Sequence, residues 1–542
     1  MVLFFSFVIS IAISLALIPL LMRYAGFLNM LDEPGERKVH VIAIPRCGGL
    51  GLAIGAVAAI LFSVPFDSEL LSLIMGSLVI VVFGFLDDRF ELSYKWKFLG
   101  QFVAVFVAMF GGLYISYVPF AGLEPAAIWI TLPLTVIFVI GVTNAVNLSD
   151  GLDGLAAGIM LMTFASIAFL AIDGGGMDVA VMALAVAGGI VGFLWFNTHP
   201  AIVFMGDTGS QFIGFMAVFL AIYLTQDVNQ TLNPALPLLL LGLPILDTLS
   251  VMVRRLRAGR SPFSPDKTHI HHSLMNHGFS HAEAVASIYL LQGVFLSSAL
   301  VFRYASDFVV IGIYLIISAT ILLFFYWAGK VQWYLHGEVE GKDRRGGVWL
   351  RNEKLFHFCR HYINYALAAF LVTQLFCLVD RILVMTTEVY VLTFSAAVLF
   401  FILPKYAQDI WVRFSIYIAA IFASVMGKEF PEMLIHTHWA MDAFLFTLIF
   451  VVSLAIRITR KTKFRITTQD LLVVLFIIAS VLLIDLNWIE HVTFRLFCLV
   501  YALEYLLHRD IYKFRLSRYL AAGSGILIIA VVLPTLHLAS NG

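Results

Sequence analysis

Long apolar runs recur from Val2 to Leu538, and no extended polar domain separates them. Many runs reach the roughly 20 residues that a helix needs to cross a hydrocarbon core about 30 Å thick. The runs are continuously apolar instead of alternating, which favours helices over a membrane β-barrel. With 61% hydrophobic and 13% charged residues among 542, the composition is also that of a membrane protein. The sequence therefore predicts an all-α, polytopic integral membrane protein.

Eleven membrane helices are expected in the first part of the chain and about seven more after it. The first eleven are expected near residues 2–22, 47–64, 69–86, 98–118, 126–142, 155–172, 178–196, 210–225, 234–252, 284–302 and 307–329. The later ones are expected near 362–379, 383–403, 414–426, 440–456, 470–486, 492–507 and 519–538. The first run has neither a basic start nor a small-residue cleavage site, so we expect a retained helix and a mature chain that begins at Met1.

Basic residues predict the orientation of these helices. With the N-terminus outside, all but four of the 34 Lys and Arg residues fall in loops that face the cytoplasm. The positive-inside rule therefore favours this orientation.

The stretch 330–360 is rich in Gly, Lys and Arg and is the predicted boundary between an eleven-helix domain, residues 1–330, and a membrane region of unknown role, residues 331–542. The four cysteines lie far apart without a C-x-x-C pairing, which argues against a disulfide framework or a zinc site.

Acidic residues and histidines gather in four of the predicted cytoplasmic loops. These loops hold Asp87-Asp88, then Asn144-Ala-Val-Asn147-Leu-Ser-Asp150-Gly-Leu-Asp153-Gly, then Asn197 with Phe204-Met-Gly-Asp207-Thr-Gly-Ser, and finally His269-Ile-His271-His272. Taken singly, each motif could be a solvated helix end, a turn or a cap. Four of them on one membrane face favour a common site.

A divalent cation is the expected counter-ion of these carboxylates, because two of the loops contain no Lys or Arg. Mg²⁺ prefers one or two carboxylates together with phosphate oxygens and waters. This preference suits the set Asp87, Asp88, Asp150, Asp153 and Asp207, with Mn²⁺ as the alternative ion. Glycines beside the carboxylates would allow a phosphate to approach the backbone closely.

Together the four loops resemble the polyprenyl-phosphate N-acetylhexosamine-1-phosphate transferases, whose superfamily also contains the phospho-N-acetylmuramoyl-pentapeptide transferases. The motifs occur here in family order. The segments Asp32-Glu-Pro-Gly-Glu-Arg37-Lys38-Val-His40 and Pro45-Arg-Cys-Gly48-Gly49 look like the N-terminal signature of the branch that uses UDP-N-acetylglucosamine. The resemblance covers roughly residues 1–330, and we recognise no motif in residues 331–542.

The resemblance implies roles for individual residues. Asp207 would bind Mg²⁺, and the catalytic set would comprise Asp87 or Asp88 at the acceptor phosphate and His271 and His272 near the diphosphate. Substrate-binding residues would be Asn144, Asn147, Asp150, Asp153, Asn197, Phe204, Lys38, His40 and His269, with Phe204 stacked on uracil.

The reaction implied is transfer of an N-acetylhexosamine-1-phosphate, with N-acetylglucosamine favoured, from a UDP-sugar to undecaprenyl phosphate. UMP would be released and a lipid-linked glycan of the cell envelope, such as a lipopolysaccharide O-antigen, would be started. The expected location is the bacterial inner membrane, with the active site on the cytoplasmic face. The substrates and membrane lipid are the expected partners, and no nucleic-acid polymer is expected. A homodimer is one option for the oligomeric state, which the sequence leaves open.

Two other functions compete with this one. The pentapeptide transferases carry Thr-Pro-Thr-Met-Gly-Gly and three consecutive histidines, whereas this chain has Ile44-Pro-Arg-Cys-Gly-Gly and His271-His272-Ser273, which disfavours that substrate. A multispanning transporter would place acidic groups near the bilayer midplane, on helices related by an internal repeat, and neither feature is visible. Direct transfer and a two-step route through an aspartyl-phosphate both remain open.

Overall fold

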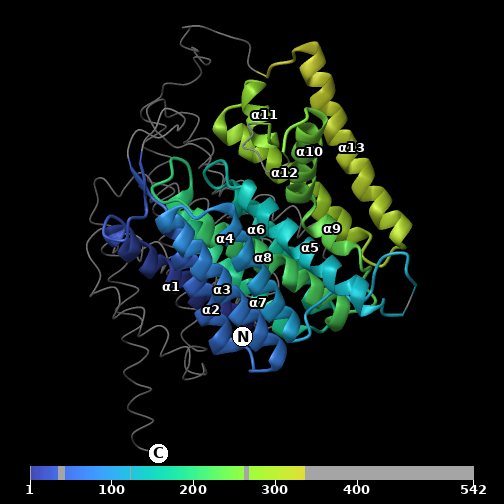
Figure 1. Ribbon diagram of the computed structural model, residues 1–542, viewed down its shortest axis with the longest axis horizontal. Coiled ribbons are helices and arrows are strands. Elements are labelled where there is room, and N and C mark those ends of the chain that lie inside the picture. Colours follow the sequence, from blue (N-terminus) through green and yellow to red (C-terminus); the bar gives the residue numbers. More distant parts are fainter. Residues whose placement is uncertain (1, 34–42, 123, 262–267, 336–542) are drawn as a thin grey trace, which may run out of the picture. The chain divides into compact units, whose positions relative to one another are not determined.

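A computed structural model describes residues 2–33, 43–122, 124–261 and 268–335 (Figure 1). Lys38, His40 and the seven helices predicted between residues 362 and 538 lie outside the described residues. Eight of the described helices are long and apolar enough to cross a membrane. The prediction of an all-α polytopic membrane protein is therefore confirmed, while the domain division at residue 330 stays a prediction.

The structure has helices at all eleven of the positions predicted in residues 1–330, together with four elements that were not predicted. The helices are α1 Val2–Tyr24, α2 Gly48–Ser63, α3 Ser68–Phe90, α4 Tyr94–Phe110, α5 Ile128–Leu148, α6 Leu155–Asp173, α7 Met177–Asn197, α8 Gly206–Tyr223, α9 Leu236–Leu240, α10 Gly242–Arg257, α11 Ile270–Asn276, α12 His281–Val301 and α13 Asp307–Val331. The run predicted as one helix over 234–252 is divided into α9 and α10. The short helix α11, a π-helical turn η1 (Leu224–Val228) and the strand pair β1 (Leu31–Asp32) and β2 (Ile44–Pro45) were not predicted.

Helix α8 runs through the middle of the bundle and packs against α2, α3 and α5 (Figure 1). Two close approaches near its N-terminus depend on glycine. A Cβ atom at Gly49 would collide with the backbone of Gly209, and one at Gly84 would lie 2.6 Å from the Cα of Thr208. Since real Cβ atoms do not approach this closely, glycine allows α2 and α3 to lie against the start of α8. That start carries Asp207.

The outer helices leave large apolar side chains uncovered. On α13, Phe308, Ile316 and Leu323 are 79%, 67% and 64% exposed. Such a surface is unfavourable in water, and in a bilayer the acyl chains cover it. The arrangement is consistent with helices that face lipid around a packed interior.

Several helices extend further than predicted, so that parts of the polar motifs are helical. Asp87 and Asp88 lie in the last turn of α3, Asn144 and Asn147 lie near the end of α5, and Asp207 lies in the first turn of α8. The prediction that these residues lie in loops was wrong. Hydropathy marks where a helix leaves the apolar core, but the backbone hydrogen bonds continue into the polar turns beyond it.

Candidate active site

Asp87 and Asp88 end the long apolar helix α3 and are both buried, at 4% and 7% exposure. The helix stops at Glu91, whose φ of 50° places it in the left-handed region. The turn folds back onto Asp87, whose Oδ1 accepts a hydrogen bond from the backbone N–H of Leu92 at 2.8 Å. The other oxygen of Asp87 contacts the ammonium group of Lys97. The carboxylate of Asp87 therefore faces the first turn of α4.

Asp88 is bound to the start of α8. Its Oδ1 accepts the backbone N–H of Asp207 at 2.8 Å, and its Oδ2 accepts the N–H and the hydroxyl of Thr208 at 2.9 and 2.5 Å. A helix N-terminus exposes unpaired N–H groups and favours a negative charge, so Asp88 caps α8 from another helix. Gly206 makes this contact feasible, because its φ is 67° and a Cβ there would lie 2.6 Å from both carboxylate oxygens of Asp88. Asp88 thereby fixes the position of Asp207.

Asp207 lies at the centre of a charged cluster contributed by four helices. Its Oδ2 accepts a hydrogen bond from Lys97 Nζ at 2.7 Å, and its Oδ1 accepts one from Asn147 Nδ2 at 2.9 Å. Asn147 also donates to the hydroxyl of Ser210 at 2.8 Å. Because Lys97 contacts Asp87 as well, one ammonium group neutralises two carboxylates. Lys97 was missing from the residues predicted for the site.

Asn144 belongs to a layer of amides beneath this cluster. Its Nδ2 donates to Gln101 Oε1 at 2.8 Å and to the carbonyl of Ile140 at 2.8 Å. Gln101 in turn donates to Gln211 at 3.1 Å. These contacts join α4, α5 and α8, so the amide of Asn144 holds together the helices that carry Lys97, Asn147 and Asp207.

The loop between α5 and α6 brings a further carboxylate toward the cluster. Asp150 is half-buried, and burial, followed by the neighbouring carboxylates with Asp207 first, raises its pKa to about 7. Burial acts in this direction because it disfavours the charged form of a carboxyl group. Asp150 is therefore only partly ionised near neutral pH.

Asn197 connects this loop with the one that follows α7. It is 3% exposed, accepts the N–H of Gly154 at 2.8 Å and donates to the carbonyl of Val203 at 2.9 Å. Both ends of its side-chain amide are thus engaged with backbone. The side chain supports the loops of the site from within.

The strand-like segment before α2 lies against the loop that carries Phe204. The N–H of Phe204 donates to the carbonyl of Pro45 at 2.7 Å, and its own carbonyl accepts the N–H of Gly48 at 3.0 Å. Phe204 itself is half-buried. These bonds bring the predicted Pro-Arg-Cys-Gly-Gly motif to the site.

The histidine motif reaches the site through α11. Its first histidine, His269, is paired with Asp247 at 2.9 Å between Nδ1 and Oδ2, and Asp247 Oδ1 accepts the N–H of Ile270 at 2.8 Å. Asp247, near the middle of α10, was not predicted as a site residue. It fixes the entry into α11, since its carboxylate is buried and both of its oxygens are bonded.

His271 packs onto the loop that carries Asp150. A Cβ on Gly151 would collide with its imidazole, so the glycine is needed for this contact. Burial, followed by the neighbouring His272, lowers the pKa of His271 to about 4, and its imidazole is neutral at pH 7. The rings of His271 and His272 lie 4.2 Å apart between centroids. All four predicted motifs therefore meet in one region.

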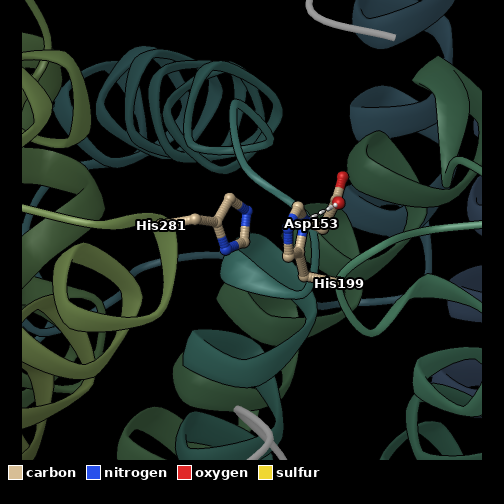
Figure 2. A group of neighbouring side chains, drawn as sticks. All are labelled: Asp153, His199 and His281. Atoms are coloured by element: carbon tan, nitrogen blue, oxygen red, sulfur yellow. Dashed lines mark hydrogen bonds and ion pairs between the residues drawn. The ribbon is translucent and has the colours of Figure 1, made fainter. Parts of the chain in front are cut away.

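Asp153 and His199 form a separate pair at the edge of this region. Asp153 Oδ2 lies 2.6 Å from His199 Nδ1 and accepts the N–H of Ala201 at 3.1 Å. The ring of His199 stacks on that of His281 (Figure 2). Asp153, which was predicted to bind substrate, therefore contacts the loop after α7 in the structure.

Fold and site together define a polytopic membrane protein with a polar centre of carboxylates, a lysine and histidines at the ends of its helices. The sequence profile of glycosyl transferase family 4 matches residues 70–225. The "Probable undecaprenyl-phosphate N-acetylglucosaminyl 1-phosphate transferase" of Bacillus subtilis (strain 168) is 38% identical over 304 residues, which make up 56% of this chain and 85% of that protein. This chain belongs to glycosyl transferase family 4, as the resemblance predicted.

Relatives from other bacteria carry related names. The "Decaprenyl-phosphate N-acetylglucosaminephosphotransferase" of Mycobacterium tuberculosis (strain ATCC 25618 / H37Rv) is 38% identical over 307 residues, covering 50% of this chain and 75% of that protein. The "Undecaprenyl-phosphate alpha-N-acetylglucosaminyl 1-phosphate transferase" of Escherichia coli (strain K12) is 32% identical over 294 residues, which cover 52% of this chain and 79% of that protein.

Proposed function

We propose that the protein transfers N-acetylglucosamine-1-phosphate from UDP-N-acetylglucosamine to a polyprenyl phosphate, most simply undecaprenyl phosphate, and releases UMP. The observation that carries the proposal is the convergence of Asp87, Lys97 and Asp207 from three helices on one point. Phosphoryl transfer depends mainly on positioning and on neutralising charge, and this cluster supplies groups suited to both tasks. The names of the relatives support a polyprenyl phosphate as acceptor, undecaprenyl phosphate in two of them and decaprenyl phosphate in the third, and N-acetylglucosamine as the sugar.

The donor set of this cluster fits Mg²⁺. The ammonium group of Lys97 contacts the carboxylates of both Asp87 and Asp207, so the space between them accommodates positive charge. Carboxylate oxygens are the ligands that Mg²⁺ prefers, and it completes its shell with waters and substrate phosphates. Asp207 would hold the ion, with Asp87 beside it, and Mn²⁺ would be the substitute. When bound, the ion would neutralise charge on the donor diphosphate.

In the proposed reaction, an oxygen of the acceptor phosphate attacks the phosphorus that carries the sugar. The bond from that phosphorus to the bridging oxygen of UMP breaks, so that polyprenyl-diphospho-N-acetylglucosamine and UMP are formed. Asp87 orients the acceptor phosphate and takes up its proton if one is present. Lys97 offsets the charge of the approaching phosphates. Asp88 acts as a positioning residue, because its hydrogen bonds hold the turn that bears Asp207.

The remaining site residues are proposed to bind the nucleotide and the diphosphate. Phe204 would stack on uracil, while Asp150 and Asn147 would face the ribose and phosphates. His271 is neutral, so it would serve as a hydrogen-bond donor and not as a fixed charge, and His272 would assist it. UMP is a phosphate leaving group of low basicity, so no strong general acid is required.

We place the site at the cytoplasmic face of the plasma membrane. The support is the distribution of Lys and Arg over the predicted loops. The lipid-linked product would then be made on the side where UDP-sugars are present, and it would start a cell-envelope glycan.

Identification of the lipid product tests this function. Purified protein in detergent receives Mg²⁺, undecaprenyl phosphate and a panel of donors: UDP-N-acetylglucosamine, UDP-N-acetylgalactosamine and UDP-N-acetylmuramoyl-pentapeptide. Mass spectrometry of the organic extract should find undecaprenyl-diphospho-N-acetylglucosamine as the main product. A product carrying the pentapeptide would replace the proposal with the alternative substrate, and no lipid-linked product from any donor would contradict it.

A further inference from the structure

Asp153, His199 and His281 meet at the rim of the candidate active site, although they come from three separate segments (Figure 2). Asp153 lies in the loop before α6, His199 follows α7, and His281 is the first residue of α12. One ligand atom from each side chain lies within 4.8 Å of the others. The His199 and His281 rings are stacked, with centroids 4.0 Å apart and an angle of 20° between their planes.

His281 is the unusual member of this group. Both of its ring nitrogens are buried, and neither has a hydrogen-bond partner among the described residues. Buried polar atoms in proteins are nearly always hydrogen-bonded, and an exception calls for a ligand or a function. Two other histidines in this part of the chain do have partners: His269 is paired with Asp247, and His277 Nδ1 lies 2.6 Å from the carbonyl of Ser273.

The surrounding structure holds His281 in place. Ser280 caps α12 through a reciprocal pair of hydrogen bonds with Glu283, so the helix start next to His281 is fixed. His199 is 45% exposed at its side chain, which leaves a route from solvent to the group. The backbone that carries His281 is therefore fixed and the group is accessible from solvent, while the two imidazole rings would turn to bring their nitrogens onto one ion.

We propose that Asp153, His199 and His281 bind a divalent transition-metal ion of the zinc class, separate from the proposed Mg²⁺ at Asp207. Two imidazoles and one carboxylate are a common three-ligand set for Zn²⁺, and they leave a fourth position for water or a substrate group. Mg²⁺ is disfavoured at this site because it prefers oxygen ligands, whereas two of the three donors are nitrogens. Binding would replace the Asp153–His199 hydrogen bond with metal bonds and give a buried nitrogen of His281 its partner.

A bound ion would tie together three parts of the site. It would link the loop that carries Asp150 and Asp153 to the loop between Asn197 and Phe204, and both of them to the start of α12. The expected consequences are a metal-dependent rise in thermal stability and a more rigid nucleotide side of the site. Neither consequence depends on the identity of the transferred sugar.

Metal binding to the full-length protein tests the proposal, with a purification tag that contains no histidine. The decisive variant is His281→Phe, which keeps an aromatic ring against His199 but removes both nitrogens. His277→Phe is the matched control, because it removes a nearby histidine outside the cluster. After incubation with Zn²⁺ and removal of free metal, wild type and His277→Phe should retain one more equivalent per chain than His281→Phe. The other histidines are present in all three proteins, so any metal that they bind contributes equally to the three measurements.

Binding of Co²⁺ gives a second measurement, which does not depend on the number of metal ions retained per chain. Co²⁺ bound by imidazole and carboxylate in a four- or five-coordinate site absorbs visible light, and this absorption should appear in wild type and disappear in His281→Phe. If His281→Phe does not give monodisperse protein, His199→Ala takes its place in both measurements. Equal Zn²⁺ content in wild type and in the folded cluster variant, or an unchanged Co²⁺ spectrum, would overturn the proposal.

Discussion

Asp88 holds Asp207 through the backbone: its carboxylate accepts the N–H of Asp207 at 2.8 Å and binds both polar groups of the next residue, Thr208. Asp87 and Asp88 are adjacent in sequence, yet their carboxylates contact different residues. Asp87 faces Lys97, whereas Asp88 caps α8. Replacing Asp87 and replacing Asp88 should therefore have different effects on the protein, although the two residues are adjacent and chemically identical.

Asp88→Ala should lower both stability and turnover. The variant loses a helix cap, which is worth about 0.5 to 2 kcal/mol, and it releases the turn that positions Asp207. Asp67→Ala is the matched control, because Asp67 caps α3 through the N–H of Leu70 at 2.7 Å, far along the helix from the site. We expect similar losses of thermal stability in the two variants but a loss of kcat only in Asp88→Ala. Wild-type kcat in a folded Asp88→Ala would contradict the positioning role.

Lys97→Met should reduce kcat by at least roughly 100-fold, the size of effect seen when one preorganised electrostatic group is removed from an active site. The variant leaves the carboxylates of Asp87 and Asp207 without their shared cation. Lys95→Met provides the control, since Lys95 lies two residues earlier on the same helix and is exposed. The measurement is steady-state UMP release at saturating donor. Equal activity of the two variants would show that the contact with Lys97 has no role in turnover.

Asp150 should make stability depend on pH. Its pKa in the folded protein, about 7, lies above the value of roughly 4 for an unfolded Asp, so the folded state binds the proton more tightly. This contribution to stability is present at low pH and is lost as the pH rises through about 7. Between pH 5 and 8 in EDTA, the Tm of wild type should therefore fall more steeply than that of Asp150→Asn. Asp178→Asn, which removes an exposed carboxyl group, should retain the wild-type slope. Parallel Tm curves for Asp150→Asn and wild type would show that Asp150 does not titrate in this range.

Direct transfer predicts that UMP and UDP-N-acetylglucosamine do not exchange without acceptor. Both oxygens of Asp87 are engaged, one by the N–H of Leu92 and the other by Lys97, which suits a carboxylate that orients a phosphate and not one that becomes phosphorylated. The test uses labelled UMP and protein stripped of lipid until mass spectrometry detects no polyprenyl phosphate. Label should enter the UDP-sugar only after undecaprenyl phosphate is added. Exchange in its absence would indicate an aspartyl-phosphate.

Much of the fold was predictable because apolar runs and basic loops report membrane helices directly. Asp87, Asp150, Asp207 and His271 could also be found, since each lies in a polar motif beside an apolar run. Lys97 could not, because a lysine at a helix start is already accounted for by the positive-inside rule, and its ion pair with Asp207 spans 110 positions of sequence. Pairings of this kind depend on which helices are neighbours in space.

The histidine at position 281 illustrates the same limit. In the sequence it follows Ser280 and precedes Glu283, and that pattern predicts only a capped helix start. Its contact with His199 arises because α12 begins beside the loop after α7. Helix ends were likewise predicted too early at Asp87 and Asn144, since hydropathy does not record where backbone hydrogen bonding stops.

Acceptor-dependent release of UMP is the most direct test of the central claim that the cluster around Asp207 transfers a sugar phosphate to a polyprenyl phosphate. Wild-type protein and Asp207→Asn, matched for yield and monodispersity, each receive UDP-N-acetylglucosamine and Mg²⁺, with and without undecaprenyl phosphate. UMP should form only with the wild-type protein, only when acceptor is present, and in a one-to-one ratio to the lipid product. UMP release by Asp207→Asn at the wild-type rate, or no release by wild-type protein with any UDP-sugar, would contradict it.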